Sequence, residues 1–182
     1  MAVLAEAISV VVRIDALRRA FADIEAFAGT VPNNSLCADG ELARVGFLMA
    51  TDVREYVRAM KAYGLVFLHD GQAKDLAVID QRNGPTTPCA WLEFGPTPCG
   101  GEPGRLVSAC RLKGGSGLRL VTPEHWQYEG SLSESYEIVP AVGGEKAVEL
   151  LDRRGYIGAY SGRLSSTTMY IGRTGRENAE QQ

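Results

Sequence analysis

The sequence predicts an α+β fold, with a mixed or antiparallel sheet whose helices are segregated to one face. Two stretches share the same apolar spacing thirty-six residues apart: Leu17, Phe21, Ile24 and Phe27 in one, and Val53, Val57, Met60 and Tyr63 in the other. A run of β-branched or bulky residues precedes each stretch. Each therefore has the pattern of a strand followed by an amphipathic helix.

The first strand–helix unit covers about residues 8–29. Residues 8–14 (ISVVVRI) are β-branched enough to favour a strand. Asp15 stands where an N-cap belongs, and Gly29 stands where a helix commonly stops. A single long helix is the alternative for this segment, with apolar positions at Val3, Ala7, Val10, Ile14 and Leu17.

The second unit covers about residues 44–64. Asp52 and Glu55 form a plausible capping pair, and Gly64 is the expected stop. We expect both helices to span about fourteen residues and to pack side by side on one sheet face. This matched pair of units predicts the scaffold of the protein.

A hairpin is expected directly after the second unit. Leu65–His69 and Asp75–Gln81 have strand composition, and Asp70-Gly71 between them is a turn signal. The following segment, 82–104, holds five of the eight prolines around the apolar residues 90–94. That pattern predicts one strand between two rigid turns.

The remaining chain is expected to complete the sheet. Arg105–Leu112 and Leu118–Val121 read as strands, and Gly144–Arg154 spaces its apolar residues as a third helix. Two more strands are predicted over 156–160 and 167–171. The sequence leaves open whether the second face of the sheet is concave and exposed or closed by the proline-rich segment.

Length and composition predict one globular domain over residues 1–172, with a disordered polar tail over 173–182. The chain has 19 Lys and Arg against 22 Asp and Glu, so the basic excess of a nucleic-acid-binding surface is missing. No eighteen apolar residues run together, which argues against a membrane span. Four widely spaced cysteines suit free thiols in the cytoplasm.

Several specific motifs are missing from the sequence. It contains no G-x-x-x-x-G-K-S/T, G-x-G-x-x-G, G-x-S-x-G, H-E-x-x-H or C-x-x-C. The common nucleotide-binding, serine-hydrolase and zinc-protease classes are therefore disfavoured. We expect no cofactor and no metal site.

The densest group of functional side chains is the segment 124–129, which contains His125, Trp126, Tyr128 and Glu129. Imidazole can act as an acid or base near neutral pH, and aromatic rings can stack on a ligand. The alternative, which we favour, is that the two aromatic residues anchor a loop to the core and the histidine is solvated.

Two further candidates lie outside that segment. His69 stands at the predicted hairpin turn, where turn chemistry explains the nearby Asp residues more simply than a metal site does. Cys37 lies in a polar loop between the two units, where a nucleophilic thiol is conceivable. Its acidic neighbours Asp39 and Glu41 oppose this role because they favour the neutral thiol.

Strand alternation predicts a third candidate group. Trp91 and Glu93 point to one face of their strand, and Arg111 occupies a face of the next. If the two strands pair, Glu93 and Arg111 form a cross-strand ion pair beside Trp91. Such a pair is either a surface brace or the polar floor of a ligand site.

These observations favour a non-catalytic cytoplasmic binding or regulatory module, of the kind found in bacteria, that recognises a small molecule or a protein. One alternative is a small enzyme in which His125 or His69 acts with a nearby carboxylate as general acid or base. A second alternative is a homo-oligomer, with a homodimer as the simplest form.

Overall fold

The computed structural model describes residues 1–100, 105–115, 119–135, 153–154, 157–161 and 168–172. It has an α+β fold with mainly antiparallel sheets, as the sequence predicts. The predicted tail over 173–182 lies outside the described residues. The predicted helix over 144–154 also lies outside them except at its end, where Arg153–Arg154 form strand β12 instead. β12 pairs with β13 (Ile157–Ser161), which pairs with β14 (Thr168–Gly172).

The central sheet has five strands in the order β3-β4-β2-β7-β8. Its members are β3 (Cys37–Ala38), β4 (Leu42–Phe47), β2 (Ile8–Arg13), β7 (Leu76–Asp80) and β8 (Gly84–Pro85), all antiparallel to their neighbours. The sequence left open whether residues 8–14 are a strand or part of one long helix. Residues Ile8–Arg13 form the buried strand β2, so the strand prediction is correct. In the centre of the sheet, both sides of β2 are paired.

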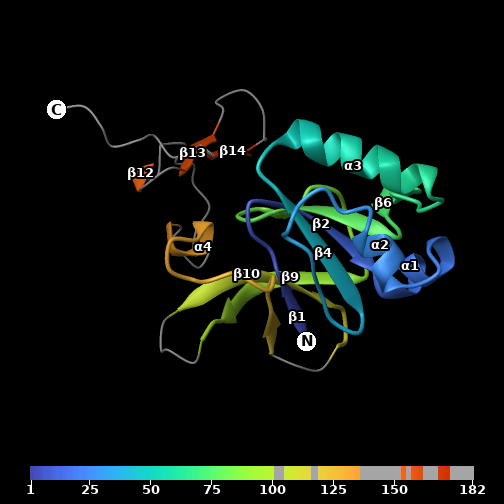
Figure 1. Ribbon diagram of the computed structural model, residues 1–182, viewed down its shortest axis with the longest axis horizontal. Coiled ribbons are helices and arrows are strands. Elements are labelled where there is room, and N and C mark those ends of the chain that lie inside the picture. Colours follow the sequence, from blue (N-terminus) through green and yellow to red (C-terminus); the bar gives the residue numbers. More distant parts are fainter. Residues whose placement is uncertain (101–104, 116–118, 136–152, 155–156, 162–167, 173–182) are drawn as a thin grey trace.

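One face of the central sheet is covered by helices α1 (Ile14–Ala20), α2 (Ile24–Ala28) and α3 (Ala50–Ala62). Figure 1 shows α3 lying across this sheet. The apolar side chains that pack here include Val10, Val45 and Leu76 from strands and Leu17, Phe27, Val57 and Met60 from helices. Because one face of each helix is buried here, apolar residues recur at helical spacing, and the sequence could therefore predict these helices.

The first predicted helix is in fact two. The chain becomes extended at Phe21, and Asp23 then caps α2 by accepting a hydrogen bond from the N–H of Ala26 at 2.7 Å. The predicted cap residues Asp15 and Asp52 are not N-caps but lie in the first turns of α1 and α3. Both predicted stops are confirmed, because Gly29 is the C-cap of α2 and Gly64 follows α3 with a φ of 93°.

The other face of the central sheet is covered by a second sheet with the order β11-β1-β10-β9. Its strands are β1 (Ala2–Leu4), β9 (Leu92–Pro98), β10 (Leu106–Leu112) and β11 (Leu120–Val121). Figure 1 shows the resulting three layers, helices, central sheet and second sheet. The face that the sequence left open is therefore buried, and β9 from the proline-rich segment helps to close it. β9 is an edge strand, which is why it can contain Pro96 and Pro98.

The predicted hairpin has the right turn but the wrong partner strand. β5 (Leu68–His69) pairs with β6 (Gln72–Ala73) across a two-residue turn, Asp70-Gly71, whose residues both have positive φ. The following strand, β7, pairs instead with β2 in the central sheet. Leu76, Ala77 and Ile79 are fully buried there, and that burial favours the central position.

The two sheets are joined by the short link between β1 and β2, which passes over a buried arginine. Arg44 in β4 is only 3% exposed. Its guanidinium donates to the carbonyl of Glu6 at 2.7 Å, to Oγ of Ser9 at 2.8 Å and to the carbonyl of Ser35 at 3.2 Å. A Cβ on Gly46 would lie 2.4 Å from this guanidinium. The position therefore has room only for glycine.

Replacing Gly46 with alanine is expected to destabilise the protein by about 1–3 kcal/mol, because the added methyl group displaces the Arg44 guanidinium from its three acceptors. Gly40→Ala is the matched control, since a Cβ there has no neighbour within 4 Å. Chemical denaturation measures both changes. Equal unfolding midpoints for the two variants would contradict the proposed role of Gly46.

Candidate interaction surface

The residues that the sequence singled out do not converge on one site. Trp91 packs against the cluster between the two sheets, whereas Trp126 and Tyr128 pack against a separate cluster with Leu4 and Val107. Glu93 and Arg111 form a third group, on the paired strands β9 and β10. The structure thus separates the predicted ligand-binding residues into three groups.

The predicted cross-strand pair between Glu93 and Arg111 is confirmed. The two residues are directly opposite each other in β9 and β10, and Nε of Arg111 donates to Oε2 of Glu93 at 2.6 Å. Both side chains are about two-fifths exposed, at 38% and 43%. Trp91, however, precedes β9 and does not follow its alternation. Its indole N–H instead donates to the carbonyl of Ala73 at 3.0 Å.

His125 and Glu129 are not arranged as an acid–base pair. His125 is exposed, and Glu129 is bound to Arg105 at 2.8 Å. The neighbouring aromatic residues anchor the loop, as favoured from the sequence: the Trp126 indole donates to Oε2 of Glu6 at 3.1 Å, and Tyr128 lies 5.0 Å from the Arg105 guanidinium. This segment is therefore fastened to the second sheet.

His69 is 63% exposed and lies 3.3 Å from Oδ2 of its neighbour Asp70. Asp80 has partners of its own, because its Oδ1 accepts hydrogen bonds from the main-chain N–H groups of Arg82 and Asn83. Over the part of the chain that the structure describes, no three His, Cys, Asp or Glu side chains gather as a metal ion requires.

Cys37 is buried in β3, and burial is the main cause that raises the pKa of its thiol, with a smaller contribution from Asp39 and an opposing one from Arg44. Burial also raises the thiol pKa of Cys89, Cys99 and Cys110. All four thiols are free. Because the thiolate is the reactive form, this environment does not activate Cys37 as a nucleophile.

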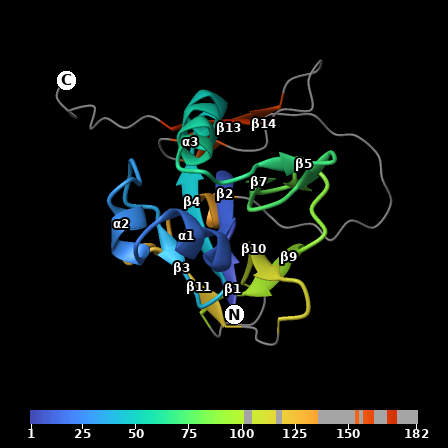
Figure 2. The ribbon, with the colours of Figure 1, turned by 90° about the vertical axis from the view of Figure 1, so that its right-hand side faces the viewer.

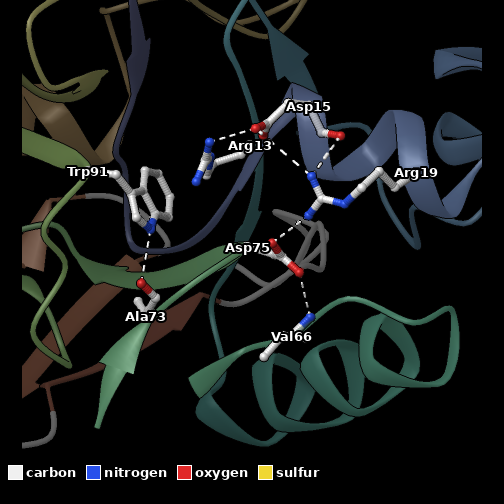
Figure 3. A network of polar contacts seen from close by, with 7 residues as sticks. All are labelled: Arg13, Asp15, Arg19, Val66, Ala73, Asp75 and Trp91. Carbon is white, nitrogen blue, oxygen red and sulfur yellow. Dashed lines mark hydrogen bonds and ion pairs between the residues drawn. The ribbon is translucent and has the colours of Figure 1, made fainter. Parts of the chain in front are cut away.

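A polar network that sequence reasoning missed fixes α1 in place, and Figure 3 shows its members. Nη2 of Arg19 binds Oδ1 of Asp75 at 2.7 Å, and Oδ2 of Asp75 accepts from the N–H of Val66 at 2.8 Å. Asp75 is nearly buried, with 6% of its side chain exposed, whereas Arg19 is 60% exposed. This one carboxylate links α1 to the segment that follows α3.

The network continues to Trp91 through Arg13, the last residue of β2. Arg13 binds Asp15 and also lies 5.9 Å from the centre of the Trp91 ring (Figure 3). The sequence singled out Asp15 and Trp91 for other roles but did not predict that they meet Arg13 and Asp75, because residues 13–15, Asp75 and Trp91 lie far apart along the chain.

The network borders a surface rich in exposed apolar side chains. We call this the α1–α2 surface and define it by Asp15, Arg19, Phe21, Ile24 and Tyr63. Ile24 is 40% and Tyr63 is 48% exposed. The half-buried Phe21 connects α1 with α3, since its ring lies 4.8 Å from Tyr63 and 5.5 Å from Phe27. Figure 2 views the molecule from the side on which α1 and α2 lie.

A second feature lies beyond the C-terminal end of α3. A depression of about 320 Å³ is lined by Lys61 and by residues 64–68. Its lining comes from one continuous segment, so it is a surface feature and not a cleft between elements. Gly64 creates the bend there: the chain leaves α3 with hydrogen bonds from Gly64 to Lys61 and from Leu65 to Met60.

Comparison with known proteins does not assign this chain to a family. No family model, no curated protein and no solved structure matches this chain. Among the described residues, no helix has the length and apolar character needed to cross a bilayer. The surface chemistry is therefore the basis for assigning a role.

Removing the charge of Asp75 tests the network. Asp75→Asn is expected to destabilise the protein by about 1–3 kcal/mol, because the Arg19 pair is lost and an amide must replace a nearly buried carboxylate. Asp15→Asn is the control, since that side chain is 53% exposed and should change stability by less than about 0.5 kcal/mol. Thermal unfolding distinguishes the two variants. An Asp75→Asn variant with the melting temperature of the wild type would show that the network does not stabilise the fold.

The thiols should be unreactive in the native protein. A raised pKa keeps a larger fraction of each thiol protonated at about pH 8.5, where a free cysteine is half ionised. We expect a disulfide reagent to label the native protein slowly there and all four thiols rapidly in guanidinium. The neutral thiols also contribute stability below the unfolded-state pKa that is lost as pH rises above it. Rapid labelling of native Cys37 would contradict this assignment.

Proposed function

We propose that this protein is a non-catalytic cytoplasmic module that recognises a protein partner through the α1–α2 surface. The observation that carries the proposal is the combination of exposed Tyr63 and Ile24 with Arg19 of α1, which the ion pair with Asp75 holds in place. Tyrosine and arginine are enriched at the centres of protein interfaces. A rigid surface also loses less conformational entropy on binding.

The two strand–helix segments, over about 8–29 and 44–64, are the scaffold in this proposal. α1 follows β2 directly, and the Arg19–Asp75 pair fixes it against the segment after α3. The aromatic contact between Phe21 and Tyr63 then holds the exposed side chains of two different units together. The partner would contact this composite surface.

A protein partner is favoured over a small molecule by the shape of the described surface. Small-molecule sites enclose most of their ligand in a concave pocket. Instead, exposed Ile24 begins α2 and exposed Tyr63 is the C-cap of α3, and the depression near α3 is lined by one segment only. The four free thiols, of which Cys37, Cys99 and Cys110 are buried, support the cytoplasmic part of the proposal.

Two substitutions on the surface test the proposal. Tyr63→Ser and Ile24→Ser are expected to weaken partner binding at least tenfold each, because each removes exposed apolar area from the α1–α2 surface. The measurement is native mass spectrometry of the protein purified from its own host. A partner retained by the wild type should be lost from both variants.

Met49→Ser is the matched control. Met49 is 41% exposed, but it lies at the opposite end of α3 from Tyr63. It should retain the partner at the wild-type level. Retention of a metabolite by all three variants, or equal loss of a partner from all three, would contradict the proposed surface.

A further inference from the structure

The outer edge of β5 carries main-chain groups that have no partner among the described residues. β5 and β6 form a two-stranded sheet, so each strand has one outer edge. The edge of β6 is occupied: the N–H of Ala73 donates to the carbonyl of Pro88 at 2.8 Å, and the carbonyl of Ala73 accepts from the Trp91 indole at 3.0 Å. No described residue covers the edge of β5 in the same way.

The register fixes which residue of β5 is available. Leu68 is directly opposite Ala73. Two opposed residues of an antiparallel pair direct their main-chain groups either toward each other or both outward. Because the groups of Ala73 point outward, the N–H and carbonyl of Leu68 also point outward, on the opposite side of the hairpin. Edge strands are commonly protected by charged residues or proline. Here the edge residue is a leucine that is 47% exposed.

We propose that this edge pairs with the same edge of a second copy of the chain, antiparallel and centred on Leu68. In that register Leu68 faces the second Leu68, and the two residues exchange two main-chain hydrogen bonds across a two-fold axis. β6-β5 of one copy then continues into β5-β6 of the other as a four-stranded sheet.

The side chains that this register opposes are complementary. Phe67 faces His69 of the other copy, which is an aromatic cross-strand pair, and it occurs twice. Val66 faces Asp70 of the other copy. Val66 and Lys61 line the same depression, so this register brings the Asp70 carboxylate to the depression that Lys61 lines.

Both partners of that contact are available. Asp70 is 89% exposed, and its one ion pair with a described residue is with His69, at 3.3 Å. Lys61 is exposed and has no ion pair with a described residue. Figure 2 shows β5 beside the end of α3, where Lys61 lies. The opposite charges therefore select the antiparallel register, and they favour a copy of this chain over a basic partner strand.

Sedimentation velocity over a range of protein concentrations tests the proposal. The wild type should show a concentration-dependent equilibrium between monomer and dimer. Lys61→Glu and Asp70→Lys are each expected to weaken the dimer about tenfold, because each replaces two symmetric attractions with repulsions. The double variant that carries both changes restores opposite charges and should recover the wild-type equilibrium. Lys74→Glu, a charge reversal at the exposed residue that follows β6, is the control and should dimerise normally.

Leu68→Pro tests the main-chain hydrogen bonds. Proline removes the outward N–H and is tolerated on an edge strand, so the variant should fold but remain monomeric. A wild type that is monomeric at every concentration would overturn the proposal, as would a dimer that is unaffected by Leu68→Pro and by both single charge reversals. Loss of a different protein partner from Leu68→Pro, with no self-association of the wild type, would assign the edge to that partner and would also overturn self-pairing. The α1–α2 surface is not altered by these variants, so the proposed function stands or fails separately.

Discussion

The buried guanidinium of Arg44 fixes the relation between the two stacked sheets. It holds the carbonyl of Glu6 in the link from β1 to β2, and it also holds Ser9 in β2 and Ser35 before β3. A buried charge is costly unless its donors are satisfied, and here three oxygen acceptors oppose that cost. Burial lowers the pKa of Arg44, whereas Cys37 and Glu6 raise it. The link therefore has one geometry, and β1 enters the second sheet at a fixed position.

The same link organises the segment beyond β11. Ala7 has a φ of 54°, an uncommon value for a residue with a side chain, and Gln81 holds it from both sides: its side chain accepts from the N–H of Ala7 and its own N–H donates to the Ala7 carbonyl. Oε1 of Glu6 then accepts from the N–H and the hydroxyl of Ser133. The loop that carries Trp126 and His125 is thus a structural cover of the second sheet, which explains why its functional residue types form no catalytic pair.

Some interactions were predictable because they depend on local spacing. The pair between Glu93 and Arg111 follows from two strands and their alternation once the strands are neighbours. The stop at Gly64 follows from its tolerance of positive φ. Trp91 departed from the expected face because it precedes β9, and strand alternation does not extend past the end of a strand. The break at Phe21 was concealed by an apolar spacing that two short helices satisfy as well as one long helix does.

The sequence by itself determined the α+β class, the strand at residues 8–13, the turn at Asp70-Gly71 and the apolar faces of the helices. These features arise from periodicity and from residues with particular backbone preferences, which act over a few positions. Only the tertiary structure decided that a second sheet covers the central one, that Arg19 meets Asp75 and that Leu68 lies at the outer edge of the β5–β6 hairpin. Those outcomes depend on which strands become neighbours. That choice is made by the burial of whole faces and by contacts between residues far apart in the chain, so no local pattern encodes it.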